Sequence, residues 1–228
     1  MTCLSFDFHG PAGVERRRVP ITDLVIAGWA GRDPHKVREH IDELALLGVA
    51  PPATTPCFYR AGTGLLTTAA MIDCLGAEAS GEVEYILYAA EDGWWVGLGS
   101  DHTDRKVEAW SITVSKQMCP KPVAAALWRF EDVAGHWDAL VLRAWVTEPQ
   151  GRVLYQQGSL DALLDPRVVV RTLRETGQDF APGTLMFGGT MPVIGGIRPR
   201  PEMELELHDP VLGRSLAHRY ATRWLANA

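Results

Sequence analysis

The chain has 228 residues, of which 46% are hydrophobic and 22% charged, so it suits one soluble domain with a well-developed core. Its net charge of −6 argues against a nucleic-acid partner and against binding to an anionic membrane surface. No apolar run reaches the ~20 residues of a membrane helix, and no signal peptide is recognisable, so we expect a cytoplasmic protein with no membrane partner. The four cysteines are scattered and predict reduced thiols rather than a disulfide framework.

The first 56 residues are expected to carry strands and one short helix. Residues 4–8 alternate between apolar and other side chains, which predicts a strand. Asp33 is a good N-cap and Pro34 suits the first helical position, so a helix is expected to begin there and to end at Gly48. Its apolar side chains recur at helical spacing, at Val37, Ile41 and Leu44.

On this predicted helix, His40 and Glu43 lie three positions apart and therefore on the same side. One interpretation is a surface pair that contributes a few tenths of a kcal/mol. The other is a dyad in which Glu43 orients His40 as a general base. The proline-rich residues 51–56 follow, which makes a mobile element that covers an active site plausible.

The clearest strand signal lies at residues 81–88, which alternate and are rich in β-branched and aromatic side chains. Residues two apart on a strand point to the same face, so Glu82 and Glu84 would direct two carboxylates to one place. A hairpin turn at 91–93 and a partner strand at 94–99 lead to Asp101, which could add a third. Three carboxylates with room for water suit Mg²⁺ or Mn²⁺, but two solvated acids on an exposed strand face would give the same pattern.

The rest of the chain predicts mostly strands. Residues 139–146 and 152–155 flank the hairpin turn 149–151, and further strands are expected at 184–187, 202–207 and 214–225. The acids of residues 202–206 are expected to form a solvated strand face.

Short helices are expected at two places in this part of the chain. Asp165 and Pro166 begin a helix that reaches Gly177, and residues 104–110 favour one or two helical turns. Pro120 and Pro122 are expected to end any regular structure around Lys116. The whole predicts an α+β protein that is predominantly β, with a few short helices.

The order of these features resembles the fumarylacetoacetate hydrolase superfamily, and the matching pieces span residues 40–192. His40-Ile41-Asp42-Glu43 is similar to its early His-x-x-Glu dyad, and Phe58-Tyr59-Arg60 to its Phe-x-Lys segment. Glu82-Val83-Glu84 resembles the Glu-x-Glu of its metal site, and Asp101-His102-Thr103-Asp104-Arg105 its Asp-x-(Ser/Thr)-x-Arg. Trp110, Lys116 and Pro120 resemble its Trp…Lys…Pro stretch, and residues 182–192 its Pro-Gly-Asp-x-Ile-x-Thr-Gly-Thr-Pro. No single piece is specific, but their occurrence together and in the family's order forms a joint signal.

The sequence also departs from the family pattern. Thr184 stands where members carry Asp, and Gly188 replaces the first Thr of Thr-Gly-Thr. Glu108 falls where several members have a glutamine that contacts substrate. A glutamate there would repel a carboxylate substrate or need a cation beside it, so the resemblance does not carry over the substrate. It points to a separate branch of the superfamily.

The resemblance implies a mixed β-sandwich roll, with residues 57–228 as the catalytic part, residues 1–56 as an N-terminal part that carries the dyad, and a homodimeric assembly. It further implies Mg²⁺ or Mn²⁺ held by Glu82, Glu84 and Asp101. His40 and Glu43 would activate a water or remove a substrate proton, and Lys116 would stabilise an enolate. Arg105, Glu108 and Thr190 would contact the substrate.

Two classes of function follow. The first is a metal-dependent hydrolase that cleaves a C–C bond of a small 2-oxo acid or 1,3-diketone, such as an acylpyruvate. Decarboxylation, hydration or isomerisation of a 2-oxo acid at the same site is the alternative reaction. The second class is a non-catalytic binding protein on the same fold.

Overall fold

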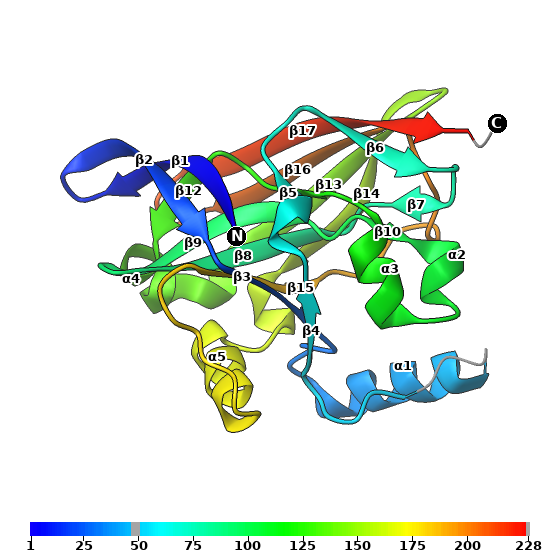
Figure 1. Cartoon of the computed structure of the whole chain (residues 1–228), viewed down its shortest axis with the longest axis horizontal. Helices are drawn as coiled ribbons and strands as arrows, with labels where there is room; N and C mark the ends of the chain where they lie inside the picture. Colours follow the sequence, from blue (N-terminus) through cyan, green and yellow to red (C-terminus); the bar gives the residue numbers. More distant parts are fainter. Residues whose placement is uncertain (47–50, 227–228) are drawn as a thin grey trace.

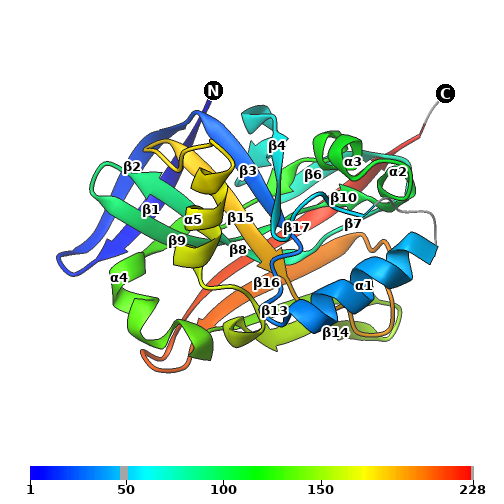
Figure 2. The same cartoon turned by 90° about the horizontal axis from the view of Figure 1, so that it is seen from below.

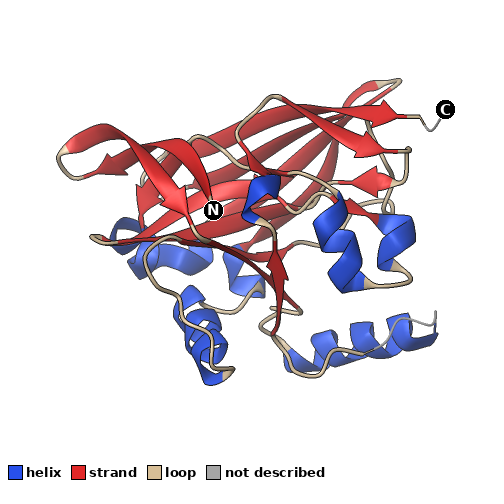
Figure 3. Cartoon of the chain, in the orientation of Figure 1, coloured by secondary structure: helices blue, strands red, loops and turns tan. Residues whose placement is uncertain are grey.

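Two β-sheets dominate the computed structural model, which describes residues 1–46 and 51–226 and, within the first helix, not the side chains of residues 40, 43 and 44. Figure 1 shows the sheets lying across each other, and Figure 3 shows that the helices gather along one side of them. None of the described helices has the length and apolar character needed to cross a membrane.

The larger sheet has eight strands, several of them distant in sequence. Their spatial order is β2 (Gly13–Ile21), β1 (Thr2–Gly10), β12 (Ala126–Arg129), β9 (Gly93–Ser100), β8 (Val83–Ala90), β15 (Thr184–Thr190), β3 (Asp23–Gly28) and β4 (Cys57–Ala61). The sheet is mixed, because β1 pairs with β12 and β15 with β3 in parallel, while β8 is antiparallel to both of its neighbours.

The second sheet has five strands, in the order β14 (Gly151–Ser159), β13 (Val141–Glu148), β16 (Glu202–Asp209), β17 (Arg214–Leu225) and β6 (Met71–Leu75). Two short ladders join β10 (Thr103–Asp104) to β7 (Ala79–Ser80) and β11 (Lys121–Pro122) to β5 (Leu66–Thr67). The α-helices are α1 (Pro34–Leu46), α2 (Arg105–Glu108), α3 (Ile112–Met118), α4 (Phe130–Val133) and α5 (Pro166–Glu175). Three 3₁₀ turns complete the described elements: η1 (Thr63–Leu65), η2 (Ala134–Ala139) and η3 (Leu160–Ala162).

The core has two parts because β8 is buried on both faces. Val83 and Leu87 of β8 belong to the cluster that includes Leu205 of the second sheet, so this cluster fills the space between the sheets. Ile86 and Tyr88 point the other way and pack with a second cluster on the opposite face of the larger sheet. Side chains alternate along a strand, so Glu84 lies on the face of Ile86 and Tyr88, away from the second sheet.

The structure confirms most of the elements expected from the sequence. Asp33 accepts hydrogen bonds from the N–H groups of His35 (2.9 Å) and Lys36 (3.4 Å), so it caps α1 as predicted. The hairpins β8–β9 and β13–β14 form, α5 begins at Pro166, and β17 has the predicted bounds. Gly48, the predicted end of α1, lies outside the described residues.

Lys116 lies on α3, a helix that the sequence did not predict and that ends at Met118, shortly before Pro120. Ser111 caps this helix by accepting a hydrogen bond from Val114 N–H (3.4 Å). Its first turn is rich in β-branched residues, which have modest helix propensity, so the local sequence gives little signal. The helix is held instead by Gln117, which donates to Arg60 C=O (2.7 Å) and accepts from Gly62 N–H (3.0 Å).

Strands from residues 1–56 and from residues 57–228 share the larger sheet. β1 lies beside β12, and β3 lies between β15 and β4. The N-terminal part therefore contributes strands to the same sheet that carries the predicted metal ligands.

Gly188 marks a point where the core allows no side chain. A Cβ at this position would overlap the buried ring of Tyr85. We expect Gly188→Ala to lower the free energy of unfolding by about 1–3 kcal/mol, the usual cost of overpacking a core. Urea denaturation monitored by tryptophan fluorescence measures this loss.

Gly135→Ala is the matched control, because a Cβ there has no neighbour within 4 Å. Its unfolding free energy should stay within about 0.5 kcal/mol of that of the unaltered protein. Equal effects of the two substitutions would contradict the packing described for Gly188.

Candidate metal and active site

Three carboxylates from two neighbouring strands converge at one end of the larger sheet. Glu82 directly precedes β8, Glu84 is the second residue of this strand, and Asp101 directly follows its partner β9. The N–H of Asp101 donates to the carbonyl of Glu82 (3.0 Å), which fixes the two segments against each other. One oxygen from each carboxylate can be chosen so that all three lie within 4.8 Å of one another.

Glu84 is almost fully buried and has one close donor. Its Oε2 accepts a hydrogen bond from Gly189 N–H (2.7 Å). The register between β15 and β8 shifts between Phe187 and Thr190, and Gly189 has a φ of 113°, a value that favours glycine. This irregularity in β15 turns a backbone N–H toward the carboxylate.

Two buried lysines hold Asp101. Lys116 Nζ on α3 lies 2.6 Å from Oδ2, and Lys121 Nζ on β11 lies 2.7 Å from Oδ1. Lys121 also donates to the carbonyl of His102 (2.6 Å). Burial alone would raise the pKa of Asp101, but the two ammonium groups outweigh it and hold the pKa below its ordinary value.

Arg105 links one more acid, Glu108, to this cluster. Its Nη2 lies 3.1 Å from Glu82 Oε1, its Nη1 lies 2.7 Å from Glu108 Oε2, and its Nε donates to Ser80 Oγ (2.7 Å). Lys116 is also 3.4 Å from Glu108 Oε1. Burial lowers the pKa of Arg105, but the neighbouring acids outweigh it and raise the pKa. The pKa of Lys116 is raised in the same way, so both side chains stay charged.

Glu84 is the group that the protein alone does not neutralise. Burial raises its pKa most, the negative charges of Asp101 and Glu82 raise it further, and the Gly189 N–H opposes them only in part. A carboxylate in such surroundings binds either a proton or a cation. The three carboxylates therefore fit a hard divalent cation, which takes oxygen ligands and would relieve this repulsion.

Thr190 lies beside the acids, but its hydroxyl is engaged. It donates to the Val83 carbonyl (2.8 Å) and accepts a hydrogen bond from Gln156 (2.8 Å). Gln156 also accepts a hydrogen bond from Val83 N–H (3.0 Å), so it ties β14 to the start of β8. In this structure Thr190 supports the strand that carries Glu84, and a contact with substrate would require its present bond to break.

The strand β4, which carries the segment that resembles the family's Phe-x-Lys, packs against α3. Cys57 and Tyr59 share one face of this strand, and a Cβ on Gly28 would meet Tyr59 Cε2 at 2.8 Å and Cys57 Sγ at 3.2 Å. Both groups experience the charge of Lys116. Arg60, which resembled the family's lysine, lies on the other face of β4 and pairs with Asp23, with Gln178 3.1 Å away.

His102 is buried behind the acids. Its Nδ1 lies 2.9 Å from the hydroxyl of Tyr220, and its Nε2 has no hydrogen-bond partner among the described residues. Burial and the nearby Lys121 lower its pKa to about 3, so the imidazole is neutral. It therefore adds no charge to the cluster.

His40 and Glu43 lie on α1, and their side chains are outside the described part of the chain. Figures 1 and 2 show α1 at the same end of the molecule as α2, α3 and β10. The predicted dyad thus stays a prediction, carried by a helix near the elements of the acid cluster.

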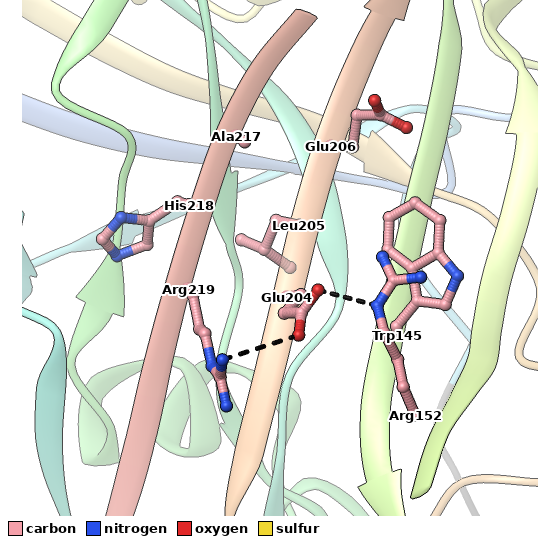
Figure 4. A pocket seen from close by; sticks show the side chains of 8 residues that line it. All are labelled: Trp145, Arg152, Glu204, Leu205, Glu206, Ala217, His218 and Arg219. Carbon is pink, nitrogen blue, oxygen red and sulfur yellow. Dashed lines mark hydrogen bonds and ion pairs between the residues drawn. The ribbon is translucent and has the colours of Figure 1, made fainter.

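A second Glu-x-Glu pair, Glu204 and Glu206, shows what a solvated strand face looks like. Figure 4 shows Glu204 on the open side of the second sheet, between Arg152 and Arg219. Its carboxylate lies 2.8 Å from Arg152, and that of Glu206 lies 2.8 Å from Arg143. The sequence predicted a solvated strand face for these acids, and the structure adds their cationic partners.

Comparison with known proteins identifies the family. A profile of the family described as "Protein of unknown function (DUF2848)" matches residues 27–220. The chain belongs to this family. No curated protein matches its sequence.

Solved structures with the same fold come from the superfamily that the motifs resemble. A protein assigned as a fumarylpyruvate hydrolase from Burkholderia cenocepacia has a TM-score of 0.69 at 17% identity, over 98% of this chain and 93% of that one. A fumarylacetoacetate hydrolase family protein from yeast has a TM-score of 0.63 at 16% identity, over 90% and 94%. The complex of 2-keto-3-deoxy-D-arabinonate dehydratase with magnesium and 2,5-dioxopentanoate has a TM-score of 0.63 at 12% identity, over 95% and 79%.

These similarities confirm the predicted fold, an α+β roll of the fumarylacetoacetate hydrolase type. The chain matches a family profile that is separate from the fumarylacetoacetate hydrolase proteins named above, which agrees with the expectation of a separate branch of that superfamily. The DUF2848 protein thus combines this fold with a cluster of three acids, Arg105 and two buried lysines at one end of its larger sheet.

The raised pKa of Glu84 predicts a specific pH dependence of stability without metal. Below its ordinary pKa of 4.5, Glu84 is protonated in both the folded and the unfolded state. As the pH rises above 4.5, the unfolded chain releases this proton first, so the free energy of unfolding falls until the folded-state pKa is passed. Glu84→Gln removes this effect.

In chelator, Glu84→Gln and the unaltered protein should melt together near pH 4.5, and the variant should melt higher at pH 8. Each 1 kcal/mol of difference in the free energy of unfolding should shift the melting temperature by about 2–4 °C. Thermal melts at several pH values measure the difference, with Glu204→Gln as the exposed control. A difference that does not change with pH would contradict the assigned environment of Glu84.

Proposed function

We propose that the DUF2848 protein is a divalent-metal-dependent enzyme that hydrolyses a C–C bond of a small 2-oxo acid or 1,3-diketone. The observation that carries the proposal is the site of Glu82, Glu84 and Asp101, whose oxygens converge within 4.8 Å. Glu84 adds to it, because its buried carboxyl has a raised pKa and only one close donor. A purely structural cluster would neutralise this group instead.

The names of the proteins that share the fold support the proposed chemistry. They include a protein assigned as a fumarylpyruvate hydrolase and a dehydratase solved with magnesium and 2,5-dioxopentanoate. Both names refer to small oxo acids. We infer that this chain also acts on a small molecule that presents adjacent oxygens to a cation.

Mg²⁺ or Mn²⁺ at Glu82, Glu84 and Asp101 would act as a Lewis acid toward the oxygens of a 2-oxo acid. Lys116 stays charged beside Asp101 and would stabilise negative charge that develops on the substrate as an enolate. Arg105 and Glu108 would set the charge at the edge of the site, and Thr190 would contact the substrate once its bond to Val83 opens. His40, oriented by Glu43, would take the proton of the attacking water.

The same groups also support an alternative reaction. If His40 does not activate a water for C–C cleavage, the site would stabilise an enolate that forms either by loss of CO2, which gives decarboxylation, or by removal of a substrate proton, which leads to hydration or isomerisation. The dehydratase among the structures of this fold favours keeping this alternative. Product analysis with candidate 2-oxo acids separates it from C–C hydrolysis.

We also propose that the protein works as a homodimer in the cytoplasm. A binding protein without catalysis is the remaining alternative. It predicts a weakened or lost metal site and no turnover of a 2-oxo acid.

The metal site can be tested with two matched Glu-x-Glu pairs. The double variant Glu82→Gln with Glu84→Gln should lose Mg²⁺ and Mn²⁺ binding, because two of three ligand carboxylates become neutral. Glu204→Gln with Glu206→Gln carries the same change in spacing and charge and should bind like the unaltered protein. Isothermal titration calorimetry of chelator-treated protein, with and without oxalate, measures both.

One metal per chain, with oxalate bound only when metal is present, is the expected result for the unaltered protein. Equal loss in both double variants would point to a general charge effect. No metal binding by the unaltered protein would overturn the enzyme proposal.

The role of His40 gives a separate prediction. His40→Ala should keep the metal affinity but lower turnover by about 10²–10⁴, the usual effect of losing an acid–base group. Glu43→Gln should lower turnover less, since it removes only the group that orients the imidazole. Loss of metal binding in His40→Ala would instead indicate that His40 is a ligand.

A further inference from the structure

Glu108 forms a bridge between the two cations that face the acid cluster. It ends α2, one turn after Arg105, and Asp104 fixes the start of that turn by accepting a hydrogen bond from Val107 N–H (2.9 Å). One oxygen of Glu108 lies 2.7 Å from Arg105, and the other lies 3.4 Å from Lys116. Both oxygens of the carboxylate are therefore used within the site.

This bridge engages both cations with the chain itself. Arg105 is held by Glu82, Glu108 and Ser80, and Lys116 is held by Asp101 and Glu108. Burial would raise the pKa of Glu108, but Lys116 and Arg105 outweigh it and keep the carboxylate ionised. A second carboxylate on a ligand would have to compete with Glu108 for these partners, and it would be repelled by it.

The charge balance of the described side chains points the same way. The cluster holds four carboxylates (Glu82, Glu84, Asp101 and Glu108) and three cations (Arg105, Lys116 and Lys121). Its net charge is −1 with every carboxylate ionised, and a divalent ion changes this to +1. Such a site balances one negative charge from the ligand, and a second would stay unbalanced in a largely buried environment.

We propose that Glu108 makes this site favour ligands that arrive as monoanions: 2-oxo monocarboxylates whose distal part carries no charge. This inference rests on the proposed function and specifies its substrate class. Glu108 acts through its charge, because it forms ion pairs with Arg105 and Lys116, which the second carboxylate of a dicarboxylate would otherwise bind. A neutral residue of the same shape at this position would make the net charge of the site more positive by one unit and strengthen the binding of a dianion.

Oxamate and oxalate are a matched pair of probes, because they have the same shape and differ by one negative charge. Their dissociation constants are measured by calorimetry on Mg²⁺-loaded protein at one fixed pH and ionic strength. The ratio of the two dissociation constants is determined for each variant and compared between variants. This comparison cancels the different intrinsic affinities of the two probes for the metal. Glu108→Gln should shift this ratio toward oxalate by about tenfold or more.

Two controls separate charge from contact. Glu108→Asp keeps the charge and should keep the ratio of the unaltered protein. Glu131→Gln removes one exposed carboxylate elsewhere and should also leave the ratio unchanged. If Glu108→Gln does not fold, the unaltered protein is tested with 2-oxopentanoate and 2-oxoglutarate, and it should bind the former, a monoanion, at least tenfold more tightly.

The outcomes are distinct. If both probes bind and the ratio is the same in Glu108→Gln and the unaltered protein, the role of Glu108 is overturned while the proposed function stands. A shift in Glu108→Asp as large as that in Glu108→Gln would also overturn it. If neither probe binds to metal-loaded protein, the proposed function fails and the inference fails with it.

Discussion

The buried contact of Asp101 with two lysines organises this end of the molecule. Lys116 comes from α3 and Lys121 from β11, and both reach the carboxylate that follows β9. An unpaired ammonium group at either position would be costly to bury, so the three residues form a unit that joins three elements. The other groups of the site are arranged around it. Glu108 contacts Lys116 and links it to Arg105, and the carbonyl of Glu82 accepts a hydrogen bond from the N–H of Asp101.

The fold and the acids of the site were largely predictable because their signals are local. Alternation along residues 81–88 placed Glu82 and Glu84 on one face, and the hairpin to β9 brought Asp101 beside them. The starts of α1 and α5 were equally clear. In each, an Asp accepts a hydrogen bond from a backbone N–H of the first turn, and the following Pro suits the first helical position because it needs no N–H partner there. In each case a few adjacent residues determine the geometry.

The parts that could not be predicted depend on contacts between distant segments. Lys121, Gln117, Gln156 and Cys57 reach the site or support it from elements far apart in sequence, and nothing in their neighbourhood indicates this. The two Glu-x-Glu pairs make the same point. Their local patterns are alike, yet Glu84 is buried by β15 while Glu204 faces arginines on an open sheet. Only the tertiary fold distinguishes them.

The contrast between Asp101 and Glu84 has an evolutionary consequence. Asp101 neutralises two buried lysines, so selection for folding alone would preserve it even in a descendant that had lost its chemistry. Glu84 opposes folding at neutral pH when no cation is present, so such a descendant would gain stability by replacing it. Among relatives of this chain, a retained glutamate at position 84 is therefore the more informative mark of a working site.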